Sequence, residues 1–82
     1  MSNDKEWTDT ASTMLVGLRV DRAYYMSKKD AERLGWYKRP VILELSGEDG
    51  RKLQIFPMQD DEGNDGGALA TSAEMNEVLP VL

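Results

Sequence analysis

The segment at positions 59–67, which reads QDDEGNDGG, holds the residues of this sequence whose types and spacing are best suited to binding chemistry. It places four carboxylates within residues 60–65 and three glycines within residues 63–67. Carboxylates this close repel one another by about a few tenths of a kcal/mol per pair, depending on exposure and salt. A loop that only connects two elements is expected to avoid that repulsion. The candidates for contact with a partner are Asp60, Asp61, Glu62, Asn64 and Asp65.

Three interpretations of this loop stay open. In the first, the glycines allow a tight irregular path while the Asp and Asn side chains cap their own turns. In the second, the acids form a recognition surface for a protein partner with a basic surface. In the third, the loop binds a divalent cation, because Ca²⁺ takes roughly 6–8 oxygen ligands from a flexible chain.

The third interpretation does not fit a known calcium loop. With Asp60 as the first ligand, Glu62 and Asn64 fall on the next two ligand positions. Asp65 then stands where a glycine is required, and Thr71 stands where the final bidentate acid belongs. The sequence leaves metal binding undecided, and a calcium-type site stays as the alternative to partner recognition.

Cysteine and histidine are both absent from the 82 residues. Their absence excludes disulfides, iron–sulfur clusters, thiolate zinc sites and catalysis by an imidazole or a thiolate. A carboxylate pair such as Asp60 with Glu62 would need a pocket that moves their two pKa values apart, and an exposed glycine loop does not build one. We therefore predict a non-enzymatic binding or regulatory module that uses residues 60–67 and needs no cofactor.

A second group of chemically able residues lies in the segment 19–39, which holds seven bases and three acids. Four aromatic residues are interleaved with these bases: Tyr24, Tyr25, Trp36 and Tyr37. Stacking aromatics beside bases is how proteins hold single-stranded nucleic acids. The sequence pI of about 4.6 weighs against it, because phosphate affinity rests on positive potential. Nucleic-acid binding is therefore the second alternative.

Charge is distributed unevenly along the chain. Residues 1–18 carry a net charge of −2, residues 19–52 carry +3, and residues 53–82 carry −6 with no base at all. The opposite middle and end either neutralise each other within one monomer or pair two copies as a homodimer. The acidic end is also the part that would meet a basic partner.

The elements that must position these residues begin after a polar start. Residues 1–12 show no apolar period, so we expect a flexible arm with Trp7 as its hydrophobic anchor, followed by a single domain over residues 13–82. Apolar residues alternate from Met14 to Met26, which predicts a strand. An arginine breaks the alternation, and we expect a bulge or a strand break near Asp21–Arg22.

A short helix is predicted over Lys28–Leu34, with Ser27 as its N-cap and Gly35 as its left-handed C-cap. A β-hairpin is predicted next, with strands Val41–Leu45 and Arg51–Phe56 joined by a glycine-containing turn.

The tail over residues 68–82 is ambiguous. Thr71 or Ser72 is suited to cap one helical turn over Ala73–Val78. The apolar stretch Leu79–Leu82 is expected to dock as an edge strand or to pack against the sheet.

These elements predict a small α+β fold with a mainly antiparallel sheet of three to five strands and one short helix after the first strand. A partly open small β-barrel is the alternative. The chain starts without a basic segment followed by an apolar run, and its longest apolar runs fall far short of the ~20 residues of a membrane helix. We expect a soluble, cytoplasmic protein with no membrane association.

Five segments follow one another along the chain: LGW at 34–36, RPV at 39–41, LEL at 43–45, DG at 49–50 and DDEGNDGGAL at 60–69. This succession resembles a family of short microbial proteins to which no activity is assigned. The resemblance covers about half of the chain and implies a stand-alone domain. It carries over no catalytic or binding residue.

Overall fold

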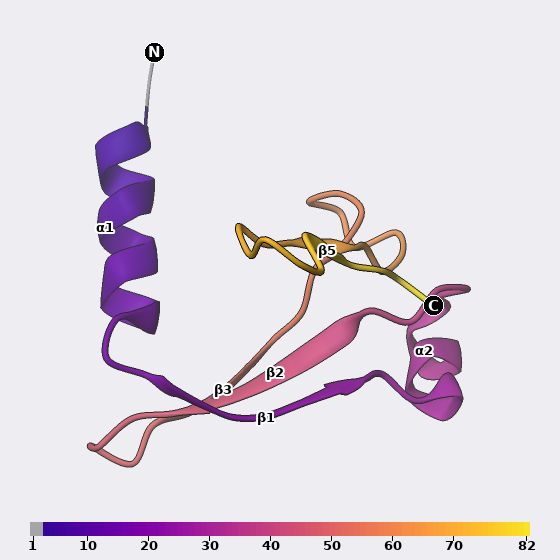
Figure 1. The fold of residues 1–82 in the computed structure, drawn as a ribbon, viewed down its shortest axis with the longest axis horizontal. Coiled ribbons are helices and arrows are strands. Elements are labelled where there is room, and N and C mark those ends of the chain that lie inside the picture. The colour runs from indigo at the N-terminus through magenta and orange to yellow at the C-terminus, as the bar shows by residue number, and fades with distance from the viewer. Residues whose placement is uncertain (1–2) are drawn as a thin grey trace.

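Residues 3–82 are described by a computed structural model and form two helices and two antiparallel sheets (Figure 1). In chain order the elements are α1 (Asp4–Leu15), β1 (Arg19–Tyr25), α2 (Lys28–Leu34), β2 (Val41–Ser46), β3 (Lys52–Ile55), β4 (Leu69–Ala70) and β5 (Val78–Leu79). The first three strands form one sheet in the order β1-β2-β3, and β4 pairs with β5 in a second. The predicted α+β fold is confirmed, and the described residues form no closed barrel.

The pairing of β1 with β2 contains a bulge that decides which side chains face which side. Val20 lies opposite Leu45, but Arg22 lies opposite Glu44, so Asp21 is the extra residue. The bulge predicted at this place is confirmed. Because of it, residues beyond Asp21 change faces relative to a regular alternation.

The two faces of the three-stranded sheet differ in polarity. The apolar sheet face consists of Val20, Ala23, Tyr25, Val41, Leu43, Leu45, Leu53 and Ile55. The opposite face consists of Arg19, Arg22, Tyr24, Ile42, Glu44, Ser46, Lys52 and Gln54. Residues 57–82, here called the C-terminal layer, lie over part of the apolar sheet face (Figure 1). The hydroxyl of Tyr25 donates to the carbonyl oxygen of Pro80 at 2.8 Å and ties the layer to the sheet.

Helix α2 forms over the predicted residues, and its ends are capped as expected. The Ser27 Oγ accepts a hydrogen bond from the Asp30 amide at 3.1 Å, which satisfies one of the unpaired donors of the first turn. Gly35 ends the helix in the left-handed conformation, with φ of 77°. The hairpin of β2 and β3 is also confirmed, with Gly50 at φ of 89° in its turn.

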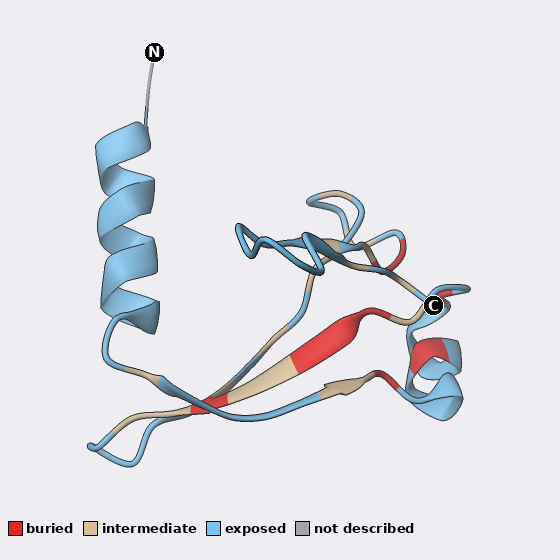
Figure 2. Cartoon of the chain, in the orientation of Figure 1, coloured by how far each residue is buried: buried red, intermediate tan, exposed pale blue. Residues whose placement is uncertain are grey.

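The core is small and lies where α2 meets β2, as the buried segments in Figure 2 show. It consists of Met26, Ala31, Trp36 and Ile42, with Tyr24 packed against it. Pro40 next to this cluster is fully buried.

Residues 4–15 form a helix, where we expected a flexible arm and the beginning of a strand. The strand prediction is wrong over Met14–Leu18, since β1 begins only at Arg19. Trp7 is not an anchor either, because 68% of its surface is exposed.

The physical reason is a helical period that the short alternation concealed. Trp7, Ala11 and Leu15 recur every four residues and lie on one side of a helix. Lys5 Nζ and Asp9 Oδ2 lie 2.9 Å apart as an i,i+4 ion pair on another side.

The tail forms a strand pair, and the alternative of a helical turn over Ala73–Val78 is wrong. Leu69–Ala70 pairs with Val78–Leu79, and Thr71 caps the connection by accepting from the Ala73 amide at 3.2 Å. Asn76 in this connection has φ of 60°, which a continuous helix excludes. Within residues 3–82 no helix combines the length and the apolar character that crossing a bilayer requires.

Candidate functional site

The acidic loop is a closed structure rather than an open linker. Met58 and Gly66 form an isolated antiparallel bridge, and the Gly67 amide donates to the Pro57 carbonyl oxygen at 3.0 Å. The loop therefore begins and ends at the same point of the C-terminal layer. Trp36 holds it from below, because its Nε1 donates to the Gly63 carbonyl oxygen at 2.8 Å.

Asp65 is buried, with 8% of its surface exposed. Its Oδ1 accepts hydrogen bonds from the Lys38 amide at 2.9 Å and from the Gly66 amide at 2.8 Å. Burial opposes ionisation of this carboxyl, but these amides and that of Tyr37 outweigh it, so the pKa of Asp65 lies below its usual value. Asp65 therefore anchors the loop to the segment after α2, and its assignment as a partner-contacting residue is not supported by this geometry.

Asp60 stabilises the loop from within. It accepts from the Glu62 amide at 3.0 Å, from the Asn64 amide at 3.3 Å and from the Asn64 Nδ2 at 2.7 Å. The Asn64 side chain is the main cause of the lowered pKa of Asp60. The interpretation in which Asp and Asn cap their own turns is confirmed for these residues.

Of the five candidate residues, Asp61 and Glu62 are left with exposed carboxylates and no internal role in the described structure. Residues 3–82 contain no group of three or more carboxylates arranged to hold a metal ion. The loop acids thus divide into two that build the loop and two that point outward. This division favours a contact surface over a cage around a cation.

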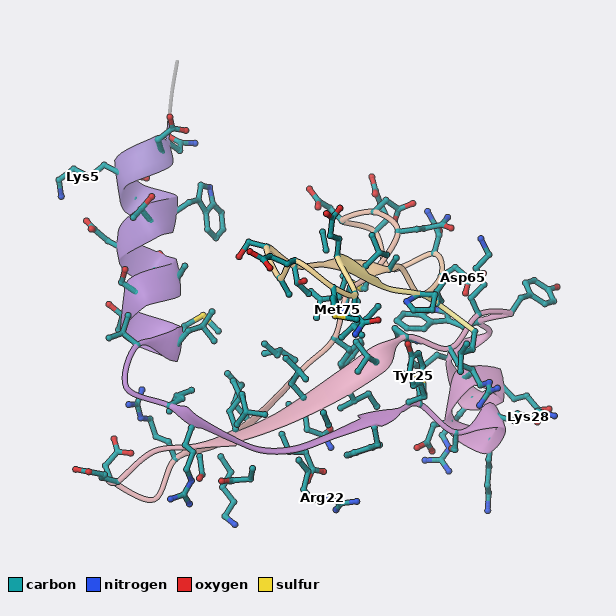
Figure 3. The ribbon with its side chains drawn as sticks, in the orientation of Figure 1. Lys5, Arg22, Tyr25, Lys28, Asp65 and Met75 are labelled. Atoms are coloured by element: carbon teal, nitrogen blue, oxygen red, sulfur yellow. The ribbon has the colours of Figure 1, made fainter. Side chains whose placement is uncertain are left out.

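The outward acids are joined by two that the sequence analysis did not single out. Glu74 and Glu77 lie on the connection between β4 and β5, in the same C-terminal layer as the loop, and both are exposed. Met75 lies beside them with 79% of its surface exposed, and Figure 3 labels it on this layer together with Asp65. The signal for this extension was the absence of any Lys or Arg after position 52.

The ion pairs of residues 3–82 include none of the four outward acids, Asp61, Glu62, Glu74 and Glu77. The acids in the five ion pairs are Asp9, Asp21, Asp30, Glu44 and Asp49, all in the first 52 residues. Five of the ten basic residues are therefore matched to acids near them in the sheet and helices. The C-terminal layer keeps its negative charge.

The basic and aromatic segment 19–39 is largely used in internal contacts. Tyr24 donates to Glu44 Oε2 at 2.5 Å, which raises the pKa of Tyr24 and lowers that of Glu44. The Arg22 guanidinium lies 4.8 Å from the Tyr24 ring centre and pairs with Glu44 at 3.4 Å. Of the segment's four aromatics, Tyr37 alone is freely accessible, with 94% exposure.

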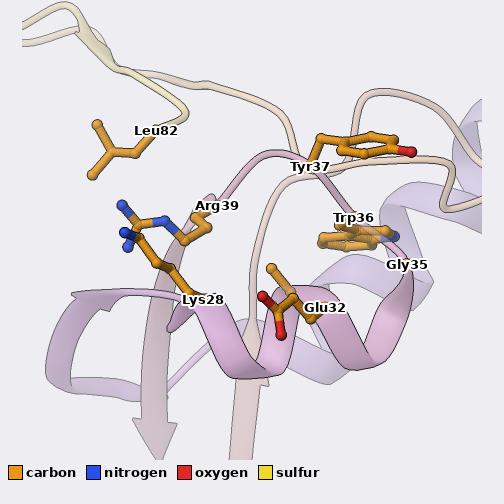
Figure 4. Close-up of a pocket in the computed structure, with 8 residues that line it drawn as sticks. Lys28, Glu32, Gly35, Trp36, Tyr37, Arg39 and Leu82 are labelled. Atoms are coloured by element: carbon orange, nitrogen blue, oxygen red, sulfur yellow. The ribbon is translucent and has the colours of Figure 1, made fainter.

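A cleft of about 540 Å³ lies beside α2 (Figure 4). Lys28 and Arg39 bring two cations to it, and Trp36 forms an aromatic wall. The main chain of Arg39 closes one side, donating to the Leu82 carbonyl oxygen at 2.8 Å and accepting from the Leu82 amide at 2.9 Å. Glu32 in the same lining offsets part of the positive charge.

Compared with models of protein families, with curated proteins and with solved structures, the chain matches none of them.

Proposed function

We propose that this chain is a non-enzymatic binding module that recognises a protein partner through the C-terminal layer. The contact residues are Asp61, Glu62, Glu74 and Glu77, together with the exposed Met75. This set is called the acidic surface. The partner is a protein whose surface combines basic side chains with an apolar patch.

The observation that carries the proposal is that these four carboxylates are exposed while every ion pair within residues 3–82 lies elsewhere. Exposed acids with no cation among them produce a negative potential over one face of the molecule. Such a potential steers a basic partner toward that face and speeds association.

The internal bonds of the loop support recognition because they fix the positions of the outward acids. Asp60 ties the backbone at Glu62, and Asp65 ties the loop to Lys38. A preorganised loop loses less conformational freedom on binding than a mobile one. Asp60 and Asp65, which are bonded inside the loop, therefore hold Asp61 and Glu62 in place for binding.

Met75 gives the surface an apolar contact of its own. It is 79% exposed, and Val78 next along the layer is 54% exposed. Methionine adapts its shape to a partner because it is unbranched and has three rotatable bonds. The carboxylates then orient the partner, and Met75 buries apolar surface against it.

Three double variants with the same net charge test the proposal by affinity capture from the native host, followed by identification of the retained proteins. Two of them, Asp61→Asn with Glu62→Gln and Glu74→Gln with Glu77→Gln, neutralise the acidic surface. The control, Glu32→Gln with Glu48→Gln, neutralises two exposed acids outside it.

We expect the wild type and the control to retain the same basic proteins and both surface variants to lose them, increasingly so as salt concentration rises. Capture that is equal in all three variants contradicts the proposal. So does a wild-type chain that retains no protein above background.

A further inference from the structure

Helix α1 touches the rest of its own chain only near its last turn, where Arg51 Nη1 donates to the Thr13 carbonyl oxygen at 3.4 Å, and it buries no residue there. All 12 of its residues are exposed, and Asn3 at its N-terminus makes no side-chain capping bond. Its sequence DKEWTDTASTML contains three threonines and two aspartates, which are weak helix formers. Helices shorter than about 12–15 residues are marginal in water without tertiary packing. A stable α1 therefore requires a surface to lie against.

The helix carries an apolar stripe suited to such a surface. Trp7, Ala11, Met14 and Leu15 fall at positions i, i+4, i+7 and i+8. Trp7 is 68% exposed and Met14 is 50% exposed. Lys5 points away from the rest of the molecule in Figure 3, which leaves the stripe on the side that faces the C-terminal layer.

A groove that can take apolar side chains lies between the last turn of α1 and the apolar sheet face. It has a volume of about 450 Å³, and its lining residues are Thr13 and Met14 of α1 with Leu18, Arg51, Lys52 and Leu53. A second hollow of about 200 Å³ continues along the same face between Leu43, Ile55, Phe56 and Leu69. The sheet therefore offers apolar surface beyond what its own chain covers.

The solvent-accessible surface of the chain is larger than that of a compact monomer of the same mass. The chain exposes 6572 Å², whereas a monomeric protein of 9.2 kDa is expected to expose about 4,900 Å². The excess is about 1,600 Å² per chain, and a stable interface of standard size covers about 800 Å² on each partner. The radius of gyration, 14.2 Å, likewise exceeds the ~12 Å expected of a compact chain of this length.

We infer that α1 is the dimerisation element of this protein and that its partner is a second copy of the chain. The apolar stripe of each α1 lies in the groove of the other copy, and a two-fold axis relates the two contacts. Charge supports the same arrangement. The helix contains three acids and one base, and the groove is lined by Lys52 and by Arg51, which also pairs with Asp49.

The dimer surface and the acidic surface share no residue, so the two proposals stand or fall separately. The test is sedimentation equilibrium of the full chain from low micromolar to several hundred micromolar concentration. Met14→Glu and Trp7→Glu place a charge in the apolar stripe. Ser12→Glu places the same charge at an exposed position of α1 outside the apolar stripe and is the matched control.

We expect the wild type and Ser12→Glu to reach twice the 9.2 kDa mass of one chain. Met14→Glu and Trp7→Glu raise the dimer dissociation constant by about 30-fold or more, as loss of a central apolar contact does. Both substituted residues are exposed in the single chain, so circular dichroism of the sheet stays unchanged.

Emission of Trp7 adds a second readout. In the dimer its indole is buried, so emission shifts to shorter wavelength as concentration rises, and the Trp7→Phe variant lacks this shift. A mass of 9.2 kDa at every concentration overturns the inference. The Trp7 contribution is the difference between wild-type and Trp7→Phe emission, because buried Trp36 emits in both; if that difference is blue-shifted at every concentration the inference is overturned as well, since α1 then folds onto its own sheet. Dimers that survive Met14→Glu as well as Ser12→Glu also overturn it.

Discussion

Gly66 lies too close to the segment after α2 to admit a side chain, and Gly66→Ala tests whether the loop is seated as described. A Cβ at this position would lie 2.6 Å from Pro40 Cδ and 3.2 Å from the Lys38 carbonyl oxygen. Pro40 is fully buried, and its ring cannot rotate out of the way. The loop must therefore move off the segment after α2 to accommodate one methyl group.

The size of the effect follows from two opposed contributions. Overpacking a tight contact costs about 1–3 kcal/mol, while replacing glycine by alanine stabilises by about 0.4–1 kcal/mol through the unfolded chain. The net loss for Gly66→Ala is about 1–2 kcal/mol, which corresponds to a fall in melting temperature of about 5–15 °C for a domain of this size.

Gly47→Ala is the matched control. Its Cβ would meet Asp49 Oδ1 at 2.9 Å and Leu18 Cδ2 at 3.0 Å, and both atoms are the far ends of side chains that can rotate. Neither Gly47 nor Gly66 has a positive φ, so the two variants differ in the rigidity of the neighbour and not in backbone strain.

Urea unfolding followed by tryptophan emission measures both variants at one fixed protein concentration, because self-association would otherwise shift the midpoint. Trp36 reports on the loop directly through its hydrogen bond to Gly63. A Gly66→Ala midpoint equal to or above that of Gly47→Ala would refute the reasoning, since the loop could then not be seated on Pro40.

Two further predictions concern titrating groups. The pKa of Asp65 is lowered in the folded chain, so its ionised form stabilises the fold above about pH 4. This stability is lost as pH falls through the folded-state pKa. In urea unfolding, the Asp65→Asn variant should therefore show a smaller decrease of the midpoint between neutral and strongly acidic pH than the wild type. The pKa of Tyr24 is raised chiefly by its hydrogen bond to Glu44, so Glu44→Gln should move the ultraviolet titration of one tyrosine to lower pH, whereas Glu48→Gln should leave it in place.

Local signals in the sequence were sufficient where neighbouring residues determine the structure. The cap at Ser27 and the left-handed Gly35 fixed both ends of α2, and the misplaced Arg22 marked the bulge in β1. Each of these depends on residues within a few positions of one another. The antiparallel hairpin of β2 and β3 follows in the same way from its turn and its apolar alternation.

Contacts between distant segments decided what sequence reasoning missed. Asp65 looked like any other loop acid, and its role depends on the amide of Lys38, 27 positions earlier. The start of the chain was misjudged for a different reason. Met14–Val16 satisfies a strand alternation and a helical period equally well, and only the spacing from Trp7 onward favours the helix.

The outer edges of the three-stranded sheet have a consequence for solubility. β1 and β3 are both edge strands, and unpaired edges invite strand-to-strand aggregation. The bulge at Asp21 twists one edge and the charges of Arg19 and Arg22 flank it, while the other edge is only four residues long and is followed by Pro57. Open-ended polymerisation through the sheet edges is thereby blocked, and a closed contact through the sheet face stays available.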